Sequence, residues 1–272
     1  MTVLTLDEAA TREAREVGGK ALGLARLVAI GLPVPGAVVV PAAAHAHWRG
    51  AGELDGRALD ELWTTARALG EPLAVRSSAA DEDAAARSAA GQYESVMNVR
   101  GREELAGAIE RCYRAAHGER AVAYRGDEGE ARLALVVQRE VLPDRSGVAF
   151  SVDPVTRARE WIVVEAAFGH GEGIVSGEVT PDRFLVHRQS GEVHAKVADK
   201  PALSNGRGRL LPLPAERRLA RSLRDHEARA VADLVIRAEA GFGVPVDVEF
   251  CLSRETIWLV QCRRITTLDV AA

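Results

Sequence analysis

Residues near the C-terminus have the types and the spacing of a magnesium–phosphate site. Asp247 and Glu249 are separated by one apolar residue, so in a strand both carboxylates lie on one face. With the connection to the next strand centred on Glu255, Gln261 lies opposite Glu249. Arg263 then lies opposite Asp247. Because Mg²⁺ takes one or two protein oxygens together with phosphate oxygens, and arginine suits phosphate, this hairpin could hold a metal–phosphate complex.

Three segments earlier in the chain could supply further contacts to phosphate groups. Arg76 ends a short apolar strand and is followed by serines, small residues and three acids, so it is well placed to reach an anion. Lys20 follows two glycines at a helix start, where backbone amides favour an anion. The small, polar loop from Ser88 through Gly91 to Gln92 could cradle phosphates with its amides.

Each of these segments also has a plainer interpretation. The hairpin could be a solvent-facing strand pair with an exposed ion pair, and a register slip of one residue would separate its polar side chains. The acids after Arg76 could mark an ordinary helix N-terminus. The loop at 88–92 could be a surface turn, and the glycines before Lys20 could be a capping pair beside a solvated lysine.

A glycine-dense turn covers residues 169–173, after an apolar strand. It lacks the G-x-G-x-x-G spacing of a dinucleotide fingerprint. We therefore expect a loop that another backbone segment or a ligand approaches closely.

The elements that must position these residues predict an α+β fold with mainly antiparallel sheets. Helical patterns dominate the first part of the chain and strand patterns the rest, so we expect one unit over 1–272 with approximate lobes 1–130 and 131–272. The predicted helices cover 6–17, 20–30, 58–69, 103–116 and 215–240. The predicted strands and extended segments cover 37–40, 72–76, 94–99, 132–141, 147–151, 160–167, 183–188, 191–197, 246–252 and 256–262.

Composition and charge argue against a nucleic-acid-binding, a membrane or a secreted protein. The chain has 272 residues, of which 47% are hydrophobic and 27% charged, and a formal net charge of −4, so a nucleic-acid partner is not expected. Its apolar runs are too short for a membrane span, and the N-terminus has no signal-peptide pattern. Three widely spaced cysteines favour neither a disulfide framework nor a zinc site. We expect a cytoplasmic protein with no membrane partner.

The order of the motifs resembles the family of phosphoenolpyruvate synthase, pyruvate phosphate dikinase and rifampin phosphotransferase. The resemblance runs from about residue 18 to about residue 268, nearly the whole chain. The segments that carry it are 18–21, 31–35, 75–79, 82–83, 88–92, 94–95, 98–99, 137–138, 146–150, 153–154, 169–172, 175–177, 181–182, 247–249 and 261–266.

The resemblance implies an ATP-grasp domain that clamps Mg·ATP between two lobes. It implies that Lys20 and Arg76 hold the ATP phosphates and that Arg263 lies on the phosphate being transferred. These three residues would form the catalytic set. Glu249 and Gln261 would bind Mg²⁺. Since phosphoryl transfer depends mostly on positioning and charge neutralisation, this set is chemically adequate.

The resemblance also implies a set of further nucleotide contacts. They comprise a flexible lid over the phosphates, with Ser88, Gly91 and Gln92, and a strand edge that meets adenine, with Gln138, Glu140 and Val141. The last is an acid in the glycine-dense turn, Glu172. Glu172 and Asp182 would support the pocket less directly. The resemblance fixes no role for Asp247, which we expect to orient Arg263. The chain departs from the residues usual in the family at Ala89, His170 and Arg264, which weakens the expectation of standard activity without removing a phosphate or metal contact.

Three functions follow as alternatives. Family enzymes continue into a swivelling domain with a phospho-accepting histidine, and none of the seven histidines here has that setting. We expect the ATP-binding half of a dikinase-type phosphotransferase, which passes the β-phosphoryl of ATP to a histidine on a separate partner domain and yields AMP and phosphate. The alternatives are a kinase that phosphorylates a small molecule directly and a non-catalytic nucleotide-binding module. The chain could also be a piece of a longer enzyme.

Overall fold

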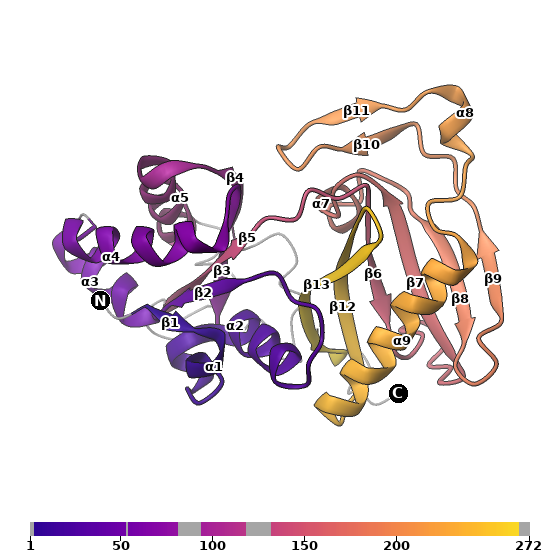
Figure 1. Ribbon diagram of the computed structural model, residues 1–272, viewed down its shortest axis with the longest axis horizontal. Helices are drawn as coiled ribbons and strands as arrows, with labels where there is room; N and C mark the ends of the chain where they lie inside the picture. The colour runs from indigo at the N-terminus through magenta and orange to yellow at the C-terminus, as the bar shows by residue number, and fades with distance from the viewer. Residues whose placement is uncertain (1–2, 53, 81–93, 118–131, 267–272) are drawn as a thin grey trace. The chain divides into compact units, whose positions relative to one another are not determined.

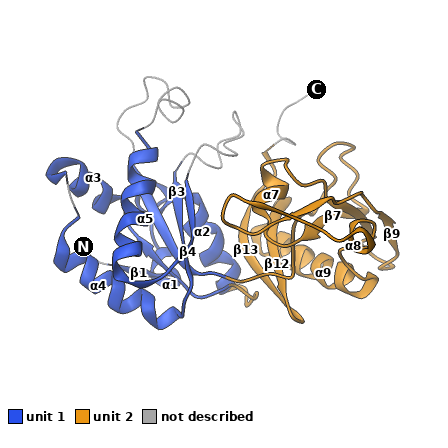
Figure 2. Ribbon diagram, turned by 90° about the horizontal axis from the view of Figure 1, so that it is seen from above, with its two compact units in different colours: residues 1–28, 35–140 blue, residues 29–34, 141–272 orange. Residues whose placement is uncertain are grey.

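The computed structural model describes residues 3–52, 54–80, 94–117 and 132–266 (Figure 1). They divide into two compact units, coloured separately in Figure 2. Unit 1 comprises residues 1–28 and 35–140, and unit 2 comprises residues 29–34 and 141–272. The strand at 133–139 therefore belongs to the first unit, although its sequence pattern resembles that of the strands that follow it.

Unit 1 is built on a five-stranded sheet in the order β1-β2-β5-β3-β4, and every neighbouring pair is antiparallel. Helices α4 and α5 bury their apolar faces against one side of it, where Leu62, Val75 and Ile109 belong to one core cluster. In chain order, the elements are β1 (Leu4–Thr5), α1 (Leu6–Ala9), α2 (Ala14–Ala29), β2 (Ala37–Val40), α3 (Ala42–Ala51), α4 (Gly56–Ala66), the 3₁₀ turn η1 (Arg67–Leu69), β3 (Leu73–Ala79), β4 (Ser95–Val99), α5 (Gly101–Ala115) and β5 (Leu133–Arg139).

Unit 2 is built on a six-stranded sheet in the order β13-β12-β6-β7-β8-β9, again with antiparallel neighbours throughout. Helix α9 packs against one face of it (Figure 1). In chain order, the elements are β6 (Arg145–Phe150), β7 (Trp161–Phe168), α7 (Glu172–Val175), β8 (Asp182–His187), β9 (Val193–Lys196), β10 (Ala202–Ser204), β11 (Leu210–Pro212), α8 (Ala215–Arg218), α9 (Asp225–Phe242), β12 (Val246–Ser253) and β13 (Thr256–Arg264). The predicted α+β class with mainly antiparallel sheets is confirmed.

Two predicted helices are each interrupted. The helix expected over 6–17 ends at Ala9, where the hydroxyl of Thr11 donates to the carbonyl of Glu8 at 2.8 Å and competes with the helical ladder. The helix expected over 215–240 is two helices, α8 and α9. The second begins at its own cap, because the carboxylate of Glu227 accepts a bond from the Arg224 backbone at 2.7 Å.

Five elements were not predicted: the strand β1, the helices α3 and α7, and the strands β10 and β11. Helix α3 follows β2 directly, and the strands β10 and β11 form a hairpin of their own. The signal for that hairpin was present, because Asn205 and Gly206 form a dipeptide typical of tight turns between two short apolar stretches.

None of the helices in the described part of the chain is long and apolar enough to span a membrane.

Candidate functional site

The C-terminal hairpin has the predicted pairing. Glu249 of β12 lies opposite Gln261 of β13, and Asp247 lies opposite Arg263. Directly opposed residues in an antiparallel pair point to the same face of the sheet, with Cβ atoms roughly 5 Å apart. The side chains of Glu249 and Gln261 therefore start from neighbouring positions on one face of the hairpin.

This pairing depends on a β-bulge that the sequence pattern does not indicate. The turn at the tip is formed by Arg254 and Glu255, with Ser253 opposite Thr256, so a regular ladder would place Val260 opposite Glu249. A β-bulge between Glu249 and Phe250 shifts the register by one residue and brings Gln261 into place. The predicted pairs are correct, but the turn is not centred on Glu255 alone.

The two faces of β12 have different roles. Val248 and Phe250 are buried on the side of α9 and belong to the core of unit 2. On the opposite face, Asp247 is 8% exposed, Gln261 is 9% exposed, and Glu249 is half-buried. This is not the fully exposed ion pair that was the alternative interpretation.

Asp247 orients Arg263. The Nε of Arg263 donates to both carboxylate oxygens of Asp247, at 3.0 and 2.8 Å. A guanidinium held through Nε is fixed in orientation, because its planar fork cannot rotate without breaking both contacts. The expectation that Asp247 orients Arg263 agrees with this geometry.

The donor set of this hairpin suits a hard cation. A carboxylate and an amide oxygen are oxygen ligands of the kind that Mg²⁺ takes. Among the residues that the structure describes, no group of three or more His, Cys, Asp or Glu side chains could hold a metal ion. A cation held by Glu249 and Gln261 would therefore need phosphate or water oxygens to complete its coordination shell.

In unit 1 the predicted helix break at residues 18–19 is confirmed. Gly18 has φ 79° and ψ 164°, which are not helical values, and it divides α2 into two parts. The hydroxyl of Ser78 in β3 donates to the carbonyl of Val17 at 2.9 Å and accepts from the amide of Ala21 at 3.2 Å. Lys20 thus lies in the first turn of the second part of α2, which is fastened to β3.

Arg76 and Ser78 lie on the same face of β3, because residues two apart in a strand point to the same side. That face meets α2, whereas Val75 on the opposite face belongs to the core beneath α4 and α5. Both Arg76 and Lys20 are half-buried. The structure therefore places the turn that contains Lys20 against the face of the sheet from which Arg76 projects.

The strand edge predicted at 138–141 needs a correction. Gln138 lies inside the sheet, opposite Ala37 of β2 on one side and Ala74 of β3 on the other, and is 2% exposed. Its backbone is therefore not at an edge. Glu140 follows the strand; its carboxylate accepts a hydrogen bond from the amide of Asn98, and its own amide donates to the carbonyl of Pro72 at 2.9 Å.

The glycine-dense turn is approached by another backbone segment. Gly169 has φ 79° and forms a parallel bridge with Ser204 of β10; a Cβ atom at Gly169 would lie 2.4 Å from the carbonyl oxygen of Ser204. Only glycine fits at this position. Of the two possibilities left open for this turn, close approach of a backbone is confirmed. Glu172 begins α7 and is exposed.

Asp182 is part of a buried polar core. It is fully buried, and its carboxylate accepts bonds from Lys200 Nζ at 2.5 Å, from the Ser222 amide at 2.7 Å and from the Ala198 amide at 2.8 Å. The hydroxyl of Ser222 in turn donates to the carbonyl of Ala166 at 2.9 Å. These contacts give Asp182 a structural role at the start of β8.

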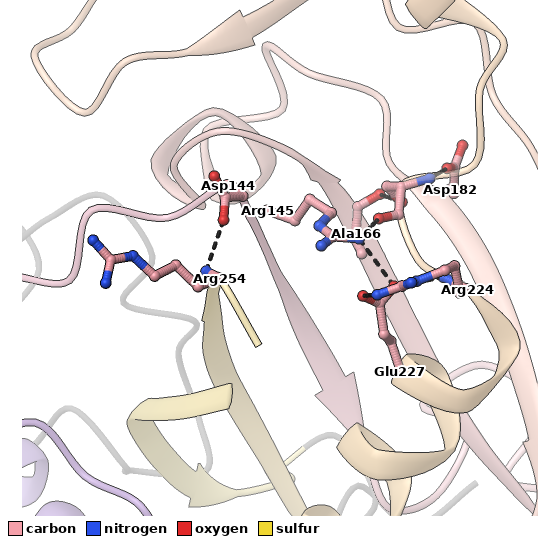
Figure 3. A network of polar contacts seen from close by, with 8 residues as sticks. Asp144, Arg145, Ala166, Asp182, Arg224, Glu227 and Arg254 are labelled. Carbon is pink, nitrogen blue, oxygen red and sulfur yellow. Dashed lines mark hydrogen bonds and ion pairs between the residues drawn. The ribbon is translucent and has the colours of Figure 1, made fainter. Parts of the chain in front are cut away.

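The same network fixes α9 to the sheet. Arg145 of β6 reaches the Glu227 carboxylate at 2.9 Å (Figure 3). Burial raises the pKa of Glu227, but the hydrogen bonds from Arg224 and the charges of Arg145 and Arg224 outweigh burial and hold the pKa below its usual value. Glu227 is therefore ionised at neutral pH and ties α9 to β6.

The predicted lid residues Ser88, Gly91 and Gln92 lie outside the described residues, as do the three acids after Arg76.

Comparison with known proteins identifies the family. Residues 56–272 match the family described as pyruvate phosphate dikinase, AMP/ATP-binding domain. The prodigiosin synthesizing transferase PigC of Serratia marcescens is 34% identical over 294 residues, which covers 97% of this chain and 33% of that protein. A rifampicin phosphotransferase of a Streptomyces species is 42% identical over 204 residues, covering 72% of this chain and 23% of the relative. A probable phosphoenolpyruvate synthase of Methanocaldococcus jannaschii is 30% identical over 314 residues, which covers 97% of this chain and 26% of that protein.

The chain therefore belongs to the family of pyruvate phosphate dikinase AMP/ATP-binding domains, and the resemblance found in the sequence is confirmed. It spans a third or less of the length of these three relatives. Arg76, Glu249, Gln261 and Arg263 all lie in the part that the family model matches.

Proposed function

We propose that the chain binds Mg·ATP and serves as the ATP-binding half of a dikinase-type phosphotransferase. In this proposal the β-phosphoryl group of ATP passes to a histidine of a partner domain and AMP leaves. Water takes the γ-phosphoryl group as inorganic phosphate. The residues of this chain suit the transfer of the β-phosphoryl group, because that step needs charge neutralisation and alignment more than covalent chemistry.

The observation that carries the proposal is the row of polar side chains on one face of the hairpin. Glu249 and Gln261 would hold Mg²⁺ against phosphate oxygens, and Arg263, oriented by Asp247, would neutralise the group being transferred. Arg76 of β3 and Lys20, whose turn packs against the same strand, would hold the remaining phosphates. Family membership supports the same assignment.

Binding of ATP is expected to depend on a divalent metal. Without Mg²⁺, the Glu249 carboxylate would face the triphosphate as a like charge, so affinity should be weak. Calorimetric titration of the chain with ATP, with and without Mg²⁺, measures this. In Glu249→Gln the like charge is removed, so metal-free affinity should rise while the gain from Mg²⁺ shrinks. Equal affinity with and without metal in the unchanged chain would contradict the metal assignment.

The nucleotide product distinguishes the dikinase from a simple kinase. Delivery of the β-phosphoryl group leaves AMP, whereas a kinase that phosphorylates a small molecule leaves ADP. We expect slow formation of AMP and phosphate by the chain alone, because water is then the only acceptor. Adding a histidine-bearing domain of a longer relative should raise the rate and place an acid-labile, base-stable phosphate on it. ADP as the sole nucleotide product of a complete reaction would show that the dikinase proposal is wrong.

A further inference from the structure

A serine hydroxyl from β3 closes the break in α2. Ser78 is fully buried, and its Oγ bonds one backbone group on each side of the break, the carbonyl of Val17 at 2.9 Å and the amide of Ala21 at 3.2 Å. The two bonds join residues 57 and 61 positions apart in the sequence. The hydroxyl therefore acts as donor and acceptor at once, which serine can do.

The break creates the need for this contact. A helix start leaves its first amides without intrahelical partners, and an N-cap side chain normally satisfies the amide of the second or third residue. Gly18 occupies the cap position of the second part of α2 and has no side chain. Ser78 supplies the missing cap from a different element, on the amide of the third residue, Ala21.

Gly18 is required for the same reason. A Cβ atom there would lie 2.2 Å from both the carbonyl oxygen and the Oγ of Ser78, and φ of 79° is disfavoured for other residues. The missing side chain thus lets β3 approach the helix closely enough for the hydroxyl to cap it. Lys20 is the second residue of the turn held in this way.

We propose that Ser78 is the positioning residue for Lys20. By capping the turn that contains Lys20, it fixes the start of that helix on the face of β3 from which Arg76 projects, two residues before Ser78. Because Arg76 and Ser78 are two residues apart on β3, the backbone of this strand then determines where the turn with Lys20 lies relative to Arg76. This inference rests on the proposed function, in which Lys20 and Arg76 hold the phosphates of ATP.

Ser77 provides a matched control in the next position of the same strand. It is also buried, at 1% exposure, but its side chain points to the opposite face, and its hydroxyl has no nitrogen or oxygen partner among the described residues. It lies near the Cys112 thiol, whose pKa burial raises to about 12, with the Ser77 hydroxyl offsetting only part of that effect. Ser77→Ala therefore removes a buried hydroxyl from the same strand without touching α2.

The test is a double-mutant cycle read out as affinity for Mg·ATP, measured by calorimetry and by the ligand-induced shift of the thermal midpoint. We expect Ser78→Ala to weaken binding about tenfold, which corresponds to about 1.4 kcal/mol. Lys20→Ala should weaken it at least as much. The double variant should bind no more weakly than Lys20→Ala alone, because Ser78 acts through Lys20. Ser77→Ala should bind as the unchanged chain does.

The results that would overturn the inference are distinct from a failure of the proposed function. If Ser78→Ala lowers the thermal midpoint but binds Mg·ATP normally, Ser78 only stabilises the fold. If the losses from Ser78→Ala and Lys20→Ala add fully, Ser78 does not act through Lys20. If Lys20→Ala itself leaves affinity unchanged, the assignment of Lys20 fails first. Should Ser78→Ala not fold, Ser78→Cys keeps the side-chain size with a weaker donor and acceptor, and the same comparisons apply.

Discussion

Replacing Glu249 with alanine is expected to reduce phosphoryl transfer by about 10²–10³-fold, the range seen when a single preorganised charge-stabilising group is removed. The carboxylate would be the anionic ligand of Mg²⁺, and without it the metal would be held at this hairpin only by the amide of Gln261 and by phosphate. The free energy of unfolding should change little, because Glu249 is half-buried on the face away from α9. Rates with labelled ATP and urea unfolding curves measure the two effects.

A control on the same strand separates metal binding from disturbance of the sheet. Cys251 lies two residues beyond Glu249, on the same face of β12 by alternation. Cys251→Ala should leave the rate of transfer nearly unchanged. A Glu249→Ala chain that transfers phosphate at the normal rate, or one that loses activity only as far as it unfolds, would show that the metal assignment is wrong.

Replacing Asp182 with alanine is expected to destabilise unit 2 by about 3–5 kcal/mol, the usual cost of removing one partner from a buried ion pair. Lys200 is fully buried, and its ammonium would keep the hydrogen bond to the carbonyl of Ala198, at 2.9 Å, but no carboxylate partner among the residues that the structure describes. The amide of Ser222 would also lose its acceptor. Urea unfolding at neutral pH measures the loss as a lower midpoint. The affinity of the folded protein for Mg·ATP should be unchanged, because none of these contacts involves β12 or β13, which carry the proposed metal and phosphate ligands of unit 2.

Two further variants make this prediction specific. Asp182→Ala combined with Lys200→Met should recover part of the stability, since no unpaired charge then remains buried. The neighbouring pair of Arg218 and Asp199 is exposed, with an N–O distance of 2.5 Å, so Arg218→Ala should change stability little. Normal stability with weakened ATP binding in Asp182→Ala would instead indicate the role in the nucleotide pocket that the resemblance implied.

Local patterns in the sequence were sufficient for much of the fold and of the candidate site. The alternation around Asp247 and Glu249 predicted a strand with two carboxylates on one face, because side-chain direction in a strand depends only on position. The glycines at 18–19 predicted a helix break, since glycine adopts positive φ without cost. The order of motifs identified the family. In each case the information lies in a few consecutive residues or in their order.

The tertiary structure decided which partners these residues meet. The hairpin pairs Glu249 with Gln261 only because a bulge corrects the register set by the tip of the turn. The helix break is closed by a serine 57 residues away from Ala21. Gln138 was predicted at an edge, but two other strands enclose it. Asp182 was expected to support the nucleotide pocket indirectly, and the structure shows that it pairs with a lysine whose burial no local pattern indicates. These outcomes depend on contacts between distant segments, and the free energy of such contacts is set by the packing of the whole unit rather than by neighbouring residues.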